Sequence, residues 1–261
     1  MDTNFILTKI FSEQLDFDKA LLLAQQSGFA ESNPKLDVGG FDAANKLSIL
    51  LAHSFGIVAN TESFIFNGIE NISLQDAIVA KGKGWKIKLV ANARKLKNGK
   101  LATFVLPQFV KESDDLFSVE NEFNAVVTES SFADKHFFKG RGAGAFPTAS
   151  AVLSDISALR YDYKYEYKKL YQQPAKLTNN FSLNALISFE DENLLPSYIK
   201  QYGEKIETDA GHEFIKVKIP FHKIQETDWW KNNLISFILL PDAIEENKNQ
   251  KAVKSELEYS V

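Results

Sequence analysis

The chain carries, over residues 24–46, the run AQQSGFAESNPKLDVGGFDAANK, which joins two predicted helices through an acidic loop. The first helix begins near residues 16–18, and Gly28 is its expected stop because glycine readily adopts the left-handed conformation found at helix ends. Residues 31–35 form a polar loop, since the residue before Pro34 is pushed out of helical geometry. A long helix over residues 41–55 then follows Gly39-Gly40 and ends at Gly56.

Strands and helices alternate in the rest of the chain. Residues 85–96 and 101–110 predict a hairpin around Asn98-Gly99, which is a strong turn signal. Further strands are expected at 62–66, 124–128 and 135–139. A helix begins with Ser73 as N-cap, and another runs through residues 149–159 after the glycines of 140–144. We also expect a helix at residues 4–14.

The C-terminal part has its own pattern. Tyr161, Tyr163, Tyr165 and Tyr167 alternate with charged residues, which favours a strand with one aromatic face over a stacking surface for nucleic acid. A strand (183–189), a helix (194–202), a strand (213–220), a helix (227–231) and a strand (234–240) follow, and then a polar tail (245–261). We therefore predict an α+β fold with helices on a mixed or antiparallel sheet, made of a domain at 1–160 and a small C-terminal α/β unit at 161–261.

Composition excludes several classes of protein. The 261 residues are 44% hydrophobic and 25% charged with a net charge of −4, so no basic surface for nucleic acid is expected. Cysteine is absent, which excludes disulfides and thiolate sites. No apolar run reaches the ~18–20 residues of a membrane span, and no signal peptide is evident. We therefore expect a cytoplasmic protein. We expect no metal site, because the four histidines lie far apart: His53, His136, His212 and His222.

Asp42 and Lys46 are the first candidates for chemistry. Their spacing of four residues places both side chains on one face of the long helix. Taken alone, this pattern indicates an exposed salt bridge worth a few tenths of a kcal/mol.

Eleven spaced positions of residues 24–46 change that interpretation. They resemble the homoserine dehydrogenase signature, in which A-x3-G-(aromatic)-(small) precedes an acid, a (D/N)-P pair, D-(aliphatic)-x-G-x-D and x3-K. The matching residues are Ala24, Gly28, Phe29, Ala30, Asn33, Pro34, Asp37, Val38, Gly40, Asp42 and Lys46. The runs at 68–72, 87–89, 105–107, 124–126 and 140–149 are also similar to blocks of this family, so the resemblance covers residues 3–157.

The resemblance implies an oxidoreductase that interconverts L-homoserine and L-aspartate 4-semialdehyde with NADP or NAD, in threonine and methionine biosynthesis. Lys46 matches the lysine at the reacting oxygen, and Asp42 would orient it. Glu31 matches the acid that binds the substrate ammonium, and Asp37 and Phe29 would complete the substrate pocket. The block at 140–149 lies beside the cofactor in the family, which implies cofactor contacts at Gly142, Gly144 and Thr148.

The chain also departs from the family. It begins partway into the family's G-T-T-N-(Y/F)-I-L run, so we expect the main nucleotide-binding domain to be missing and the chain alone to be inactive. The family implies a homodimer. The C-terminal unit lies where some members carry an amino-acid-sensing ACT module, but residues 191–194 replace the expected D-x-P-G turn. The alternative is a non-catalytic remnant that dimerises or binds an amino acid.

Overall fold

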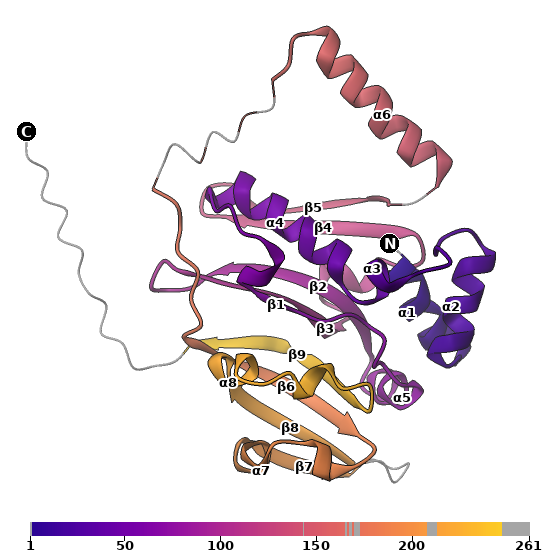
Figure 1. Cartoon of the computed structure of the whole chain (residues 1–261), viewed down its shortest axis with the longest axis vertical. Coiled ribbons are helices and arrows are strands. Elements are labelled where there is room, and N and C mark those ends of the chain that lie inside the picture. Colours follow the sequence, from indigo (N-terminus) through magenta and orange to yellow (C-terminus); the bar gives the residue numbers. More distant parts are fainter. Residues whose placement is uncertain are drawn as a thin grey trace, which may run out of the picture.

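The computed structural model describes residues 2–142, 144–164, 166, 169, 173–207 and 213–246. Its centre is a mixed sheet in the strand order β2-β3-β9-β6-β8-β7 (Figure 1). The short β1 also pairs with β3, on the same side of β3 as β9 and opposite β2. The predicted α+β class is confirmed. The strands are β1 (Ile65–Phe66), β2 (Trp85–Lys95), β3 (Leu101–Lys111), β6 (Phe181–Phe189), β7 (Gly203–Glu207), β8 (Glu213–Pro220) and β9 (Ile235–Glu246).

The β2–β3 hairpin confirms its sequence signal. The two strands pair antiparallel along their whole length, from Trp85 opposite Lys111 to Lys95 opposite Leu101. Gly99 takes a φ of 77° in the turn, a left-handed conformation that glycine adopts without steric cost. β3 is almost continuously buried because it has a strand on both edges and side chains packed on both faces.

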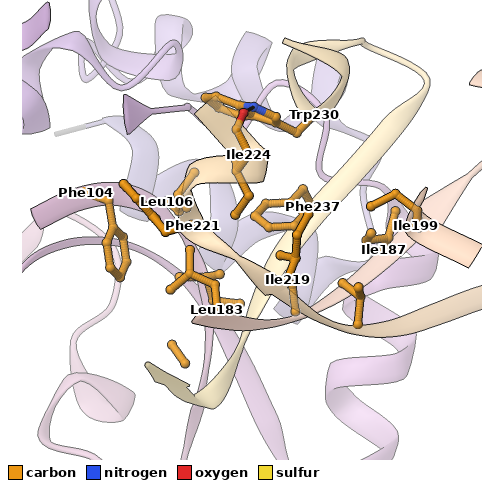
Figure 2. Close-up of a cluster of buried hydrophobic side chains, with 14 of the residues drawn as sticks. Phe104, Leu106, Leu183, Ile187, Ile199, Ile219, Phe221, Ile224, Trp230 and Phe237 are labelled. Atoms are coloured by element: carbon orange, nitrogen blue, oxygen red, sulfur yellow. Dashed lines mark hydrogen bonds between the residues drawn. The ribbon is translucent and has the colours of Figure 1, made fainter. Parts of the chain in front are cut away.

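One face of the sheet carries the larger aromatic core (Figure 2). Alternate residues point to it, such as Phe104 and Leu106 of β3 and Phe237 of β9. Its cover comes from short helical elements, among which Trp230 is fully buried and donates from its indole nitrogen to the carbonyl of Ile224 at 2.9 Å. These elements are η4 (Glu192–Leu194), α7 (Ser197–Tyr202), α8 (Phe221–Gln225) and η5 (Trp229–Lys231).

The opposite face is covered by the N-terminal helices. Phe109, Phe214 and Ile238 of the sheet pack with α1 (Asp2–Glu13), α2 (Phe17–Gln26) and α5 (Leu74–Gly82). Leu47 and Leu51 of α4 (Phe41–Phe55) pack on another part of this face. The short α3 (Lys35–Val38) lies within the predicted acidic loop region. Of the predicted strand at 62–66, residues 65–66 form β1, whereas residues 62–63 belong to η1 (Thr61–Ser63).

The C-terminal elements have a βαββαβ order, β6-α7-β7-β8-α8-β9, and their strands lie in the sheet order β9-β6-β8-β7. This is the order of a ferredoxin-like split βαβ unit. The same strands belong to the central sheet, because β9 pairs in parallel with β3 at Leu239 and Gln108. The division of the chain at residue 160 stays a prediction.

A second hairpin and a helix extend away from the central sheet (Figure 1). β4 (Phe123–Ser130) and β5 (Asp134–Arg141) pair only with each other among the described strands. They follow η2 (Asp115–Ser118) and lead into α6 (Ala145–Arg160), which has no buried residue. Apolar side chains such as Phe146 and Leu159 are 87% and 72% exposed.

Some predicted elements are wrong. The tyrosine strand is not formed at Tyr161 or Tyr163, which lie in a turn and an irregular segment after α6, whereas Tyr165 and Tyr167 lie outside the described residues. The predicted helix at 227–231 is a short 3-10 turn, and α8 precedes it. β9 continues through the start of the predicted polar tail because Glu246 pairs with Phe181 of β6. Within the described part of the chain, no helix combines the length and apolarity that a membrane crossing requires.

Candidate functional site

Asp42 and Lys46 lie on the outward face of α4. Gly40 precedes the helix with a φ of 84°, and Gly56 ends it with a φ of 68°. Lys46 Nζ lies 2.5 Å from Asp42 Oδ2, and the two side chains are 47% and 36% exposed. The sequence prediction of an i,i+4 pair is confirmed, and the pair faces solvent in this chain.

Asp37 lies in α3, one turn before α4. Its amide donates to the carbonyl of Pro34 at 2.9 Å, and its carbonyl accepts from the amide of Gly40 at 3.0 Å. Thr3 of α1 donates to the same carbonyl over 3.5 Å. The backbone of Asp37 therefore links α1, α3 and the start of α4.

A close crossing of two backbone segments fixes the start of α4. Residues 38–40 cross residues 67–69, and the amide of Ile69 donates to the carbonyl of Val38 at 2.8 Å. A Cβ added at Gly68 would lie 1.6 Å from the carbonyl oxygen of Val38, and one at Gly40 would lie 2.8 Å from that of Asn67. Only glycine permits this approach, which gives a physical reason for Gly40 and Gly68.

Phe29 and Glu31 lie at the other end of the segment. The Phe29 ring packs on Phe5 of α1 with centroids 4.9 Å apart, and the amide of Phe29 donates to the carbonyl of Ala24. Glu31 is exposed, and its backbone carbonyl accepts from Gln25.

These contacts connect three of the predicted site residues, Asp37, Asp42 and Lys46. Asp42 and Lys46 form an ion pair, and the backbone of Asp37 contacts the start of their helix. Among the described residues, Asp42 is the only carboxylate that Lys46 contacts, and Glu31 forms no ion pair with it. The described residues also contain no group of three acidic or histidine side chains able to hold a metal ion.

The predicted cofactor contacts lie around the start of α6. Gly144 has a φ of 110° and makes no side-chain cap, and the first turn of α6 carries no acidic residue. Such a helix start accepts a polar or anionic group well. The hydroxyl of Thr148 donates to the carbonyl of Gly144 at 3.0 Å, and the amide of Gly142 donates to that of Glu122 at 3.0 Å.

The glycine run before α6 differs from the glycine-rich turn of a dinucleotide-binding unit. Such a unit places this turn between a first parallel strand and its helix. Here the glycine run follows β5, whose partner β4 is antiparallel. The residues around this run therefore lack the βαβ arrangement of a dinucleotide-binding unit.

Sequence reasoning missed a polar pair between α1 and β2. Lys88 of β2 is 7% exposed, and its ammonium donates to Asn4 Oδ1 at 2.9 Å and to the carbonyl of Val119. Burial lowers the pKa of Lys88 to about 8, and the nearby charge of Lys86 acts in the same direction. The available signal was the position of Lys88 between Ile87 and Leu89, because a buried ammonium requires polar partners.

Comparison with known proteins identifies the family of this chain. The family model described as "Homoserine dehydrogenase" matches residues 2–157. The homoserine dehydrogenase of Bacillus subtilis is 38% identical over 157 residues, which cover 60% of this chain and 36% of the relative. This chain thus spans about a third of the length of that relative.

Solved structures extend the likeness of fold beyond residue 157. A homoserine dehydrogenase from Thiobacillus denitrificans superposes with a TM-score of 0.71 at 24% identity, covering 92% of this chain and 62% of that one. A hyperthermophilic archaeal homoserine dehydrogenase, solved in complex with NADPH, superposes with a TM-score of 0.50 at 31% identity, covering 62% of this chain and 46% of that one. With the family model matching more than half of its residues, this chain belongs to the homoserine dehydrogenase family.

Proposed function

We propose that this chain supplies the substrate-binding and proton-transferring part of an enzyme that interconverts L-homoserine and L-aspartate 4-semialdehyde with NADP or NAD. The observation that carries the proposal is the Asp42–Lys46 pair on the open face of α4, one turn after Asp37. This pair lies within the segment that matches the family model. The reaction would serve threonine and methionine biosynthesis.

Lys46 is the proposed acid/base. Oxidation of homoserine removes a hydride from the carbinol carbon and a proton from its hydroxyl, so a group must accept that proton. In the neutral form, Lys46 would accept it at Nζ, and in the reverse direction the ammonium would return it to the aldehyde oxygen. Asp42 would orient Nζ through the contact at 2.5 Å.

Glu31, Asp37 and Phe29 are the proposed substrate contacts. Homoserine carries an ammonium group, which an acidic loop complements through charge-assisted hydrogen bonds. Glu31 is exposed on the segment before α3, so its carboxylate is accessible to a ligand. Phe29, packed on Phe5, would give one apolar wall.

The nicotinamide group supplies hydride transfer when it is bound. We propose that Gly142, Gly144 and Thr148 contact it from the start of α6, and that a nucleotide-binding domain packs on the exposed apolar side chains of α6. Leu153 and Ile156, which are 65% and 57% exposed, lie on successive turns and suit such an interface. That domain would also cover the Asp42–Lys46 pair and exclude water from it. We further propose a homodimer, as the family resemblance implies.

The alternative is a non-catalytic protein that dimerises or binds an amino acid. It is favoured by the absence of a dinucleotide-binding βαβ unit from the described residues. The two proposals differ in turnover once a nucleotide-binding domain is supplied.

Fusion of this chain to a homologous nucleotide-binding domain tests the proposal. We expect homoserine-dependent reduction of NADP or NAD by the fusion. Glu31→Gln should raise KM for homoserine by about 10–100-fold, because the substrate ammonium loses its charged partner. Glu13→Gln, at another acid on the protein surface, is the control. A well-folded fusion without turnover contradicts the enzyme proposal and favours the alternative.

A further inference from the structure

The first turn of α1 contacts two segments that are far apart in the sequence. On one side, Thr3 and Phe5 contact Asp37 and Phe29 of the predicted substrate loop (residues 28–40). On the other side, Asn4, which lies between Thr3 and Phe5 in the sequence, contacts residues 119–123. We call these residues the hairpin base, because they lead directly into β4. One helical turn therefore joins the substrate loop to the hairpin base.

Asn4 binds the hairpin base through its side-chain amide. Its Nδ2 donates toward the carbonyls of Val119 and Asn121 at 3.2 Å each and of Phe123 at 2.9 Å, so two hydrogens serve three acceptors. The amide of Asn121 in turn donates to Thr8 Oγ1 at 3.1 Å, and Asn121 has a φ of 55°. Left-handed backbone at a residue other than glycine persists where its surroundings hold it.

Lys88 holds Asn4 in this orientation. The ammonium donates to Asn4 Oδ1, which fixes the amide so that Nδ2 faces the carbonyls, and it donates to Val119 of the hairpin base as well. The charged groups around Lys88 are Lys86 on the same strand, Glu120 in the hairpin base and Lys139 on β5. Lys88 lies on β2, which is an edge strand of the sheet. It is nevertheless buried, because the hairpin base covers it.

The hairpin depends on these contacts for its position. β5 is exposed along its whole length, and β4 and β5 have no other strand partner among the described residues. Other contacts run to η2, from Lys139 to the carbonyl of Ser118 at 3.0 Å and from Lys135 to Asp115 at 2.9 Å. The hairpin base also forms ion pairs with Lys86 of β2, through Glu120, and with Arg141 of β5, through Glu122. The hairpin ends at Gly142, so its orientation sets where the start of α6 lies.

We propose that Asn4, held by Lys88, is a positioning residue that fixes the β4–β5 hairpin against α1 and thereby sets the start of α6 relative to the substrate loop. A role of this arrangement in catalysis rests on the proposed function. The positioning of the hairpin by Asn4 does not. It can therefore be tested in the chain without substrate or cofactor.

Amide hydrogen exchange of the full chain tests this directly. Asn4→Asp keeps the size of the side chain but replaces the donor with an oxygen facing three carbonyl oxygens. We expect amides of residues 119–141 to lose about tenfold or more of their protection while those of α4 and β6 change by less than about twofold. The matched control is Asn71→Asp, which removes one exposed bond from Asn71 to the carbonyl of Asn232.

The dependence of hairpin protection on pH tests whether Lys88 positions the hairpin base or only fills space beneath it. An opened hairpin base exposes Lys88 to water, where a lysine pKa is about 10.4, whereas the closed form has a pKa of about 8. The closed form binds fewer protons, so closing is favoured as the pH rises. Corrected for intrinsic exchange, hairpin protection should increase roughly tenfold from pH 7 to pH 9. Lys88→Met should abolish this increase.

Three results overturn the proposal. They are unchanged hairpin protection in Asn4→Asp, a loss of protection spread equally over α4 and β6, and the same pH profile in the wild type and Lys88→Met. If Asn4→Asp does not fold, the comparison of Lys88→Met with the wild type decides alone. None of these measurements depends on homoserine turnover, so failure of the proposed function is recognised separately.

Discussion

Gly68 and Gly40 show how single residues place the candidate site. The carbonyl of Val38 lies where a side chain at Gly68 would begin, and the hydrogen bond from Ile69 closes the same crossing. Because α4 starts directly after this crossing, the position of Asp42 and Lys46 depends on a backbone contact rather than on their own side chains.

Gly68→Ala tests this dependence. A Cβ at 1.6 Å from the carbonyl oxygen of Val38 forces the two segments apart, at a cost of about 3 kcal/mol or more. The melting temperature should fall by about 6–12 °C in a chain of this size. Gly82→Ala is the control, because a Cβ there meets nothing within 4 Å and should stabilise α5 slightly. Equal melting temperatures for the two variants would contradict the account of the crossing.

At the scale of elements, Asp76 joins the helix α5 to the sheet. Its Oδ2 accepts from the amide and hydroxyl of Ser73 at 2.8 and 2.7 Å, and its Oδ1 accepts from Ser188 of β6 at 2.8 Å. Burial raises the pKa of Asp76, and the hydrogen bonds from Ser73 and Ser188 oppose this rise only in part. The carboxyl group of Asp76 thus both caps α5 and binds β6 of the sheet.

The raised pKa predicts a pH dependence of stability. In the folded state the protonated form of Asp76 is favoured, so its contribution is fully present below the unfolded pKa of about 3.9 and is lost as the pH rises through the folded value. Relative to Asp76→Asn, the wild type should therefore lose stability as the pH rises above about 4. Denaturant unfolding of both proteins at each pH measures this, and a constant difference would show that Asp76 keeps an ordinary pKa.

Local signals predicted the elements whose form is decided locally. The bounds of α4 follow from Gly40 and Gly56, the β2–β3 hairpin from Asn98-Gly99, and the start of α5 from Ser73. The failures depend on contacts distant in sequence. β9 extends through residues that look like a polar tail because β6 offers it partners. β7 was missed because it is an edge strand that, among the described strands, pairs with β8 alone.

The candidate site was predicted to a similar extent. The pair of Asp42 and Lys46 follows from helical spacing alone, whereas the roles of Glu31, Asp37 and Phe29 rest on resemblance and stay predictions. The Asn4–Lys88 pair spans 84 residues of sequence, and no periodic pattern reveals such a contact.

At the scale of the whole molecule, the open face of α4 and the exposed helix α6 lead to a prediction for the turnover of the isolated chain. Lys46 is 47% exposed, so water competes with any substrate at Nζ, and we propose that binding of the nicotinamide requires a separate nucleotide-binding domain. Purified alone, the chain should show no homoserine-dependent reduction of NADP or NAD, as followed by the absorbance of the reduced cofactor. Turnover by the isolated chain would mean that it binds the cofactor in a way that the described fold does not indicate.

The turnover of Lys46→Ala in the fusion with a nucleotide-binding domain tests the central claim most directly. If Lys46 transfers the proton of the reacting hydroxyl, kcat should fall by about 10²–10⁴-fold. Lys9→Ala is the matched control, because Lys9 forms an exposed i,i+4 pair with Glu13 at 2.6 Å and should leave kcat unchanged. Melting temperatures of both variants distinguish lost chemistry from lost fold. A folded Lys46→Ala fusion with the kcat of the Lys9→Ala control would contradict the assignment and leave the Asp42–Lys46 pair as a surface salt bridge.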